Sequence, residues 1–489
     1  MDFLAPLLSN VWSAFLVVLF FGGSIFVHEL GHFLAARKRG AKVERFSIGF
    51  GPAIWSRRGK DGVEYRLSWI PLGGYVLLPQ LADLGPVEGE STTDVTTLPP
   101  IDYTSKMLIL VAGASFNILF AFALACIVWL VGEPTFSELN TTRIGTVNAV
   151  IKLADGTTVP NPAADAGLQA GDNVTSIDGH RVANFEDILN GVLLGKGRAT
   201  DDRRKAIFVI ERAGQSMEIV VYPRLLGDDK IRISGVEPAE DLTAESLLPD
   251  WPAALAGIKP GDRIIAVDGK PVFQRVAISE HLAKNTSRPS EFLLQRGQEQ
   301  ITLRIQPRLD TDERTGKSVP RIGLRYRDNI VILHPTPWAQ VSNDVVSTFR
   351  TLGALLSPSS DIGPSKLSGP IGIARALHQQ AQWDIRRALW FVILVNVNLA
   401  IFNLLPIPVL DGGQILFATI GRIRRRELPA NFIMATQSAF FVILMSLIVY
   451  VSFFDVKRWA RDSRAERPAP AATPPAPAPS APVPTPVGK

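Results

Sequence analysis

The sequence predicts a polytopic α-helical membrane protein with four transmembrane helices. Four long runs are almost free of charged residues, and 46% of the 489 residues are hydrophobic, with a mean hydropathy of +0.17. A duplicated segment between the second and third runs predicts two tandem domains inserted between the helices. The fold class is therefore a helical membrane domain that carries a duplicated outer part.

The composition excludes several other classes of protein. The single cysteine, Cys126, allows no intrachain disulfide and no cysteine-rich zinc site. The high apolar content excludes a chain that is disordered throughout. A net charge of +5, from 51 basic and 46 acidic residues, gives no argument for binding nucleic acid, and we expect no nucleic-acid partner.

The four apolar runs lie at residues 12–36, 107–131, 388–405 and 431–454. Each has about the 20 residues that a helix needs to cross ~30 Å of hydrocarbon. No basic residue precedes the first run and no small-residue cleavage site closes it, so it is interpreted as a retained helix and not a signal peptide. Buried helices of a large soluble protein are the alternative, which four such runs make unfavourable.

Basic residues indicate how the helices are oriented. Residues 1–36 carry none, 37–106 carry ten, and 410–430 carry four arginines. Because cytoplasmic loops carry an excess of Lys and Arg, the last two segments are expected in the cytoplasm. The N-terminus and residues 133–387 then lie on the outer, periplasmic side. Five basic residues at 457–467 conflict with this topology.

Residues 162–179 recur 90 residues later, at 252–269. Both copies keep Pro-Ala-Ala-x-Ala-Gly, a Gly-Asp pair and a closing Asp-Gly, which predicts a short helix, a glycine turn, an apolar strand and a tight turn. The pattern resembles the PDZ domain of bacterial membrane and periplasmic proteases. A PDZ domain binds an extended peptide or a C-terminus as an added strand. A steric plug over the membrane part is the alternative role.

The predicted order of segments follows from these features. Residues 456–489 form a basic and then Pro/Ala-rich tail that is unable to bury a core and is expected to be flexible. The other expected segments are a first transmembrane helix (1–36), a cytoplasmic-side loop with a membrane-associated β-hairpin (37–106), a second transmembrane helix (107–132), a first PDZ domain (133–226), a second PDZ domain (227–330), an outer linker with amphipathic helices (331–387), a third transmembrane helix with the segment after it (388–430) and a fourth (431–455).

An HExxH motif, His28-Glu29-Leu30-Gly31-His32, lies inside the first apolar run. Residues four apart share one face of a helix, so both histidines can bind one zinc ion while Glu29 takes a proton from water. Two histidines and a glutamate are costly in an apolar segment unless they are paired or coordinated. A buried polar network without a metal is the alternative.

A catalytic zinc needs a third protein ligand and one open position. The other four histidines lie in the outer segment, so the candidate is Asp411, in the stretch Asn403-Leu-Leu-Pro406-Ile-Pro408-Val-Leu-Asp411-Gly-Gly. The two prolines break the third helix, and irregular backbone at membrane depth is tolerated where it lines a polar cavity. Asp411 is therefore expected to face the zinc, with a turn or helix cap as its alternative role.

These two motifs together resemble the site-2 protease family of intramembrane zinc metalloproteases, and the repeat resembles the PDZ pair of its bacterial RseP-type members. The resemblance spans about residues 10–455. Further shared elements are Gly49-Phe-Gly51, Gly73-Gly-Tyr75, Gly113-x-x-x-Asn117 and Ser368-Gly-Pro-Ile-Gly372. Ala114 and Gln414 stand where the family often has Pro and His, but neither departure removes a proposed ligand.

The resemblance implies a zinc endopeptidase in the bacterial inner membrane, in contact with lipid, that performs regulated intramembrane proteolysis. It implies single-span substrates such as trimmed anti-sigma factors, and also remnant signal peptides. It implies that Asn403 positions the substrate or the oxyanion; bonding to another helix is the alternative role of this residue.

The predicted hairpin is the second element that the resemblance links to substrate. Residues 63–69 alternate between apolar and polar, and 71–74 predict a turn before a second strand. The family implies that the edge of this hairpin, with Gly73, Gly74 and Tyr75, holds the substrate as an added strand. A hairpin that only packs on the membrane surface is the alternative.

Two other function classes were weighed. A catalytically inactive PDZ-bearing membrane adaptor would need neither Glu29 nor the full set of zinc ligands. A transporter with a polar intramembrane site fits four spans and two large outer domains poorly.

Overall fold

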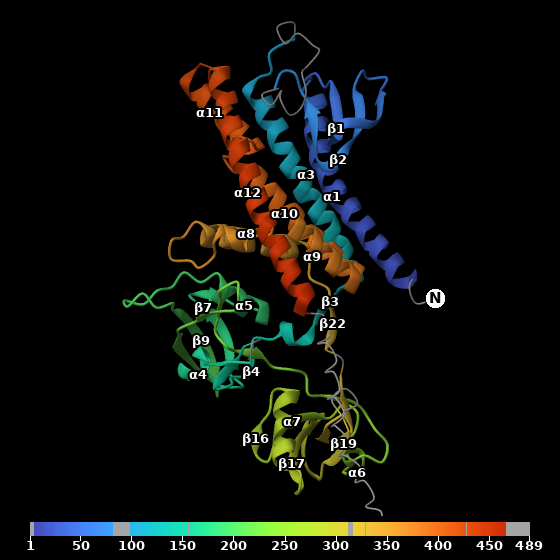
Figure 1. Ribbon diagram of the computed structural model, residues 1–489, viewed down its shortest axis with the longest axis vertical. Coiled ribbons are helices and arrows are strands. Elements are labelled where there is room, and N and C mark those ends of the chain that lie inside the picture. The colour runs from blue at the N-terminus through green and yellow to red at the C-terminus, as the bar shows by residue number, and fades with distance from the viewer. Residues whose placement is uncertain are drawn as a thin grey trace, which may run out of the picture.

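The computed structural model describes residues 4–81, 98–153, 156–311, 316–327, 329–426 and 428–465 (Figure 1). Within this part, four helices are long and apolar enough to cross a membrane, which confirms the four predicted spans. They belong to α1 (Leu4–Lys38), α3 (Tyr103–Val131), α10 (Ile385–Asn403) and α12 (Ala430–Ala465). The Pro/Ala-rich part of the predicted tail lies outside the described residues.

Helix α3 is the centre of the membrane bundle and packs against both α1 and α10. Small residues let the backbones approach closely: a Cβ at Gly31 of α1 would lie 2.8 Å from the carbonyl carbon of Ala112. On the other face of α3, Ala121 and Ala125 share a buried cluster with Val392 of α10. Helix α12 instead packs against α9 (Pro370–Trp383) and the short helix η3 (Pro364–Lys366).

A small sheet of β1 (Arg45–Arg58) and β2 (Glu64–Leu77) covers one end of the bundle (Figure 1). Residues 45–48 pair with 74–77 on one side and with 64–67 on the other, while 53–58 pair with 64–68. Strand β2 thus stays continuous through the predicted turn at 71–74. It bends there instead, so that its two arms flank the start of β1, and the arm at 74–77 forms an edge of the sheet.

Positive φ angles at Gly49, Gly51 and Gly73 make these bends possible, since other residues rarely adopt this conformation. The inner part of the sheet packs on the bundle through a cluster that includes Phe33 and Phe46. Other parts of the sheet expose large apolar side chains, among them Trp55 and Trp69. Exposed apolar patches of this kind are typical of interaction surfaces for a protein partner, a ligand or a membrane.

Two β-rich domains lie beyond the opposite end of the bundle (Figure 1). The first repeat domain, which holds residues 162–179, has a sheet of order β10-β9-β7-β8, and the second, which holds 252–269, has the equivalent order β18-β17-β15-β16. The sheet strands are β7 (Asn173–Ile177), β8 (His180–Arg181), β9 (Ala206–Arg212), β10 (Gln215–Val221), β15 (Arg263–Val267), β16 (Lys270–Pro271), β17 (Ser290–Arg296) and β18 (Glu299–Ile305).

The repeated residues have the same roles in both domains. The closing Asp-Gly pairs have positive φ at both residues, as a tight two-residue hairpin turn requires. The aspartates of the Gly-Asp pairs, Asp172 and Asp262, are buried and paired with Arg212 and Arg296 on equivalent strands. The domain helices are α4 (Pro162–Asp165), α5 (Phe185–Leu193), α6 (Pro252–Leu255) and α7 (Arg275–Lys284).

The hydrophobic cores of the two repeat domains divide between Val236 and Leu242, later than the predicted boundary at 226/227. The reason is that β13 (Glu237–Pro238) returns to pair with β4 (Ile144–Thr146) of the first repeat domain.

The remaining elements are β3 (Glu133–Phe136), η2 (Ser137–Asn140), β5 (Val150–Lys152), β6 (Thr158–Pro160), β11 (Arg224–Leu226), β12 (Ile231–Ile233), β14 (Ala244–Leu247), β19 (Arg308–Thr311), β20 (Ser318–Arg321), β21 (Leu324–Tyr326), β22 (Ile330–Leu333), α8 (Pro337–Leu355) and α11 (Asp411–Arg424).

Helix α12 continues through the basic stretch that conflicts with the predicted topology. Arg458 pairs with Asp455, and Arg461 pairs with Asp229 of the first repeat domain. These arginines therefore have partners within the fold, so their position after the fourth span has a structural reason. The predicted end of this helix at 455 is too early by at least ten residues, because the ion pairs stabilise the extra turns.

Candidate active site

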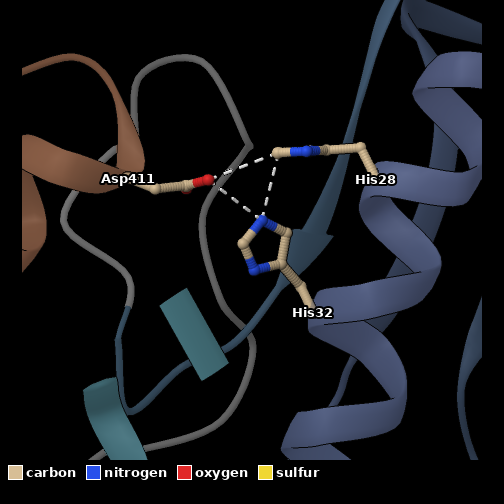
Figure 2. Close-up of side chains that lie close together, drawn as sticks. All are labelled: His28, His32 and Asp411. Atoms are coloured by element: carbon tan, nitrogen blue, oxygen red, sulfur yellow. Dashed lines mark hydrogen bonds and ion pairs between the residues drawn. The ribbon is translucent and has the colours of Figure 1, made fainter. Parts of the chain in front are cut away.

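The predicted zinc ligands meet near the C-terminal end of α1, against the sheet. His28 and His32 lie one turn apart on α1, and Asp411 is the first residue of α11 (Figure 2). The two Nε2 atoms are 3.2 Å apart. Each of them lies 3.4 Å from Oδ2 of Asp411.

This triangle of donor atoms fits a zinc ion. Zinc binds nitrogen and oxygen at about 2.0–2.2 Å, and two ligands of a tetrahedron at that range are about 3.3–3.5 Å apart. Oδ2 of Asp411 is buried and has no hydrogen-bond partner among the described residues, as expected of an oxygen kept for a metal. Two imidazoles and one carboxylate are a donor set of catalytic zinc sites, which keep a further position open.

Contacts from α3 and α10 orient the two histidines. His32 Nδ1 donates to the carbonyl oxygen of Ile109 at 2.8 Å, which leaves the lone pair of Nε2 facing Asp411. The amide nitrogen of Asn117 lies 3.2 Å from His28 Nδ1, and that of Asn403 lies 3.3 Å from His28 Nε2. The rings are thus held by contacts from two neighbouring helices, α3 and α10.

Glycines let the backbone approach the site closely. A Cβ at Gly113 of α3 would lie 2.7 Å from Cε1 of His32 and 2.8 Å from Cε1 of His28. A Cβ at Gly74 of β2 would lie 2.9 Å from Cγ of Glu29. At Gly412, it would overlap the carbonyl group of Leu404, so glycine is required where the chain turns from α10 into α11.

All the predicted site residues line one cavity of about 930 Å³. Glu29 is 9% exposed, so it is buried beside the two histidines. Residues of both the β2 edge and α12 contribute to its lining. The predicted residues that line it are His28, Glu29, His32, Gly73, Gly74, Tyr75, Asn403 and Asp411.

Two groups of site residues were not assigned from the sequence. Gly113 and Asn117 appeared there only as part of a shared motif; their spacing of four puts them on one face of α3, a signal that could have placed them at the site. The wall formed by α12, with Gln437, had no such signal, because nothing in the sequence shows which helix covers the cavity.

Comparison with known families gives a match to the model of peptidase family M50 over residues 15–447. The chain belongs to peptidase family M50. Its relatives include the regulator of sigma-E protease RseP of Escherichia coli strain K12, 29% identical over 475 residues that cover 91% of this chain and 99% of that protein. A Vibrio cholerae protein named as a zinc metalloprotease is also 29% identical, with 92% of this chain and 99% of that protein covered.

A Salmonella typhimurium strain LT2 regulator of sigma E protease is 28% identical over 91% of this chain and 99% of its own length. Among solved structures, a PDZ domain of an SdrC-like protein from Listeria monocytogenes matches 18% of this chain and 86% of its own, at 20% identity and a TM-score of 0.16, a likeness too small to carry an argument. The family match confirms the site-2 protease resemblance. This M50 peptidase is a zinc-dependent metalloendopeptidase.

Proposed function

We propose that this M50 peptidase cleaves single-span membrane proteins within or near the bilayer, with His28, His32 and Asp411 as zinc ligands and Glu29 as the general base. The observation that carries the proposal is the triangle of donor atoms inside a cavity bounded by membrane helices. Relatives named as regulators of sigma-E protease fit a role in sigma-factor regulation. The proposed substrates are therefore anti-sigma factors trimmed on the outer side. Remnant signal peptides are a second substrate class.

The chain's own residues divide the work of the reaction. Zinc, when bound, supplies a Lewis acid that activates water and polarises the scissile carbonyl. Glu29 accepts a proton from the attacking water and returns one to the leaving amine. The Asn403 amide, beside His28, donates a hydrogen bond to the substrate carbonyl as negative charge develops on it.

The substrate is proposed to bind as a strand along residues 74–77. This arm pairs with 45–48 on one side only among the described residues, and Gly74 and Tyr75 line the cavity. A peptide bond inside a helix is shielded until the helix unwinds, and addition to a sheet edge supplies the main-chain bonds that the unwound segment has lost. Arg45 Nη1 donates to the Tyr75 hydroxyl at 3.2 Å and steadies this edge.

The two repeat domains are proposed to be tandem PDZ domains on the periplasmic side of the inner membrane. Their matching strand order and Asp-Gly turns support the duplication. Their place at the end of the bundle opposite to the β1–β2 sheet fits a cytoplasmic sheet and periplasmic domains (Figure 1). There they would bind peptides or C-termini of trimmed substrates and exclude substrates with bulky outer domains.

The test pairs zinc content with cleavage of a model single-span substrate by purified wild type and by Glu29→Gln. We expect about one zinc per chain in both proteins, with cleavage by wild type only. A wild type that binds no zinc and leaves every trimmed substrate intact would overturn the proposal. The catalytically inactive PDZ-bearing adaptor would then be the better account.

A further inference from the structure

Gln437 of α12 is a buried amide without partners. Its exposure is 3%, and neither Nε2 nor Oε1 has a hydrogen-bond partner among the described residues. The residue lies within the membrane-spanning part of α12. An unsatisfied polar group at membrane depth is costly because no water is there to bond it, so the bare amide needs an explanation.

Other buried amides in the helical part each bond through their nitrogen. Asn396 donates to Ser24 Oγ at 2.9 Å, and Gln340 donates to the carbonyl oxygen of Ala125 at 3.1 Å. Among the buried Asn and Gln side chains of the described residues, Gln437 is the one with both amide atoms unpaired. Helix packing therefore does not account for it.

Gln437 lines the same active-site cavity as the edge of β2. Met434, Ser438 and Phe441 share this α12 wall, and Gly74 and Tyr75 line the cavity from the sheet. The spacing of three and four residues places the α12 group on one face of the helix. A peptide bound along the sheet edge would thus occupy the cavity that Gln437 also lines.

The chemistry of an added strand matches an amide at this place. In a strand, the N–H and C=O groups of one residue point to one neighbour, and those of the next residue point to the opposite side. A substrate strand on residues 74–77 would leave every second residue with both groups facing away from the sheet, toward the rest of the cavity that Gln437 lines. One glutamine side chain offers one acceptor and two donors, enough to bond both groups of such a residue.

We propose that Gln437 is a substrate-binding residue that hydrogen-bonds the main chain of the unwound substrate, with Nε2 donating to a carbonyl oxygen and Oε1 accepting from an N–H. This inference rests on the proposed function, because it requires a substrate strand at the β2 edge. It identifies α12 as the second wall of the substrate site. Recognition through the main chain places no demand on the substrate's side chains at this position.

The test compares Gln437→Met, which keeps the length of the side chain and removes both hydrogen bonds, with Thr436→Val. Thr436 is the half-buried neighbour, and its hydroxyl donates to the carbonyl oxygen of Phe432 at 2.8 Å. The full-length protein in detergent acts on a synthetic single-span peptide that wild type cleaves. A peptide series with single backbone amides replaced by esters removes one N–H at a time.

We expect Gln437→Met to lower kcat/KM about tenfold or more, at unchanged zinc content and Tm, and Thr436→Val to change it less than about twofold. One ester should lower kcat/KM in wild type and have little effect in Gln437→Met, because the bond it removes is already absent. If Gln437→Met lowers the Tm, Gln437→Leu is measured by the same criteria.

A variant that keeps kcat/KM within about twofold of wild type, or ester effects of equal size in both proteins at every position, overturns the role of Gln437. Neither result affects the proposed function, which depends on cleavage by wild type and its loss in Glu29→Gln. Absence of cleavage by wild type would instead contradict the proposed function itself.

Discussion

The two walls of the active-site cavity are built in opposite ways. The wall of α1, α3 and the start of α11 is closely packed, with glycines at the contacts and hydrogen bonds to both histidines. The α12 wall is loosely held: 11% of its most apolar stretch is buried, against 28%, 33% and 39% in the other spans. The proposed zinc ligands and general base thus lie on the closely packed wall. The α12 wall, which we propose binds substrate, has an unpaired amide and few packing contacts that would prevent it from shifting.

The largest effect is expected from replacing Asp411, the proposed zinc ligand at the start of α11. Asp411→Asn keeps the shape of the side chain but replaces the charged ligand with a neutral amide. Zinc content and cleavage should both fall to background, beyond the roughly 10–100-fold loss typical of groups that only bond to a ligand. Metal analysis and the cleavage assay measure this.

Asp384→Asn is the matched control for that change, since Asp384 caps the N-terminus of α10 away from the cavity. It should keep both zinc and activity. An Asp411→Asn protein with one zinc per chain and normal cleavage would contradict the ligand assignment.

Gly113→Ala tests whether close packing fixes the histidines. The added Cβ would press on both rings, so we expect about a 100-fold loss of kcat, the size of effect caused by misplacing a reacting group by about 1 Å. Gly22→Ala on α1 has no atom within 4 Å of the new Cβ and should leave the rate unchanged. If both variants react at the same rate, α3 and the histidine rings can shift to accommodate the added Cβ, and close packing does not fix the histidines.

Asn117→Ala should act through His28 and not on the substrate. Loss of the bond to Nδ1 is expected to weaken zinc binding about 10- to 100-fold, measured by competition with a chelator. Ser115→Ala, an exposed residue on the same helix, should bind zinc as wild type does. If zinc affinity is unchanged but cleavage is slower, the role of Asn117 is to contact the substrate and not to orient a zinc ligand.

The smallest effect on cleavage is expected at the far end of α12. Asp455 accepts hydrogen bonds from the backbone N–H groups of Gly369 and Gly372 and pairs with Arg458, so Asp455→Ala should lower the free energy of unfolding by about 3 kcal/mol. Arg461→Ala breaks a half-exposed pair and should cost about 1 kcal/mol or less.

Denaturant unfolding measures the free energy of unfolding of both variants, and metal analysis measures whether each variant keeps its zinc. A loss of zinc in Asp455→Ala would mean that the anchored end of α12 also holds the closely packed wall. The contrast between the two walls would then be smaller than their packing suggests.

Much of the site could be predicted because its signals are local in the sequence. The four spans follow from the length of uncharged runs, and the pair of histidines follows from a spacing of one helical turn. Asp411 follows from prolines that end a helix beside it. The duplicated Gly-Asp and Asp-Gly turns likewise predicted the equivalent strands of the two repeat domains.

Other features depend on residues far apart along the chain. The bend of β2 at 71–74 looks like an ordinary turn until both of its arms are seen to pair with residues 45–48. The boundary between the repeat domains moves because β13 returns to β4. The end of α12 depends on ion pairs with Asp229 and Arg375, which no local pattern shows.

The sequence by itself therefore determined the spans, the metal-binding residue types and the duplication, because hydrophobic length and helical spacing act within one segment. Only the tertiary structure decided that α3 supplies Gly113 and Asn117 to the histidines and that α12 brings Gln437 to the cavity. Helices in a bilayer have no strong local rule for choosing their neighbours, since lipid is as apolar as their side chains. Close packing at small residues and a few polar bonds make that choice.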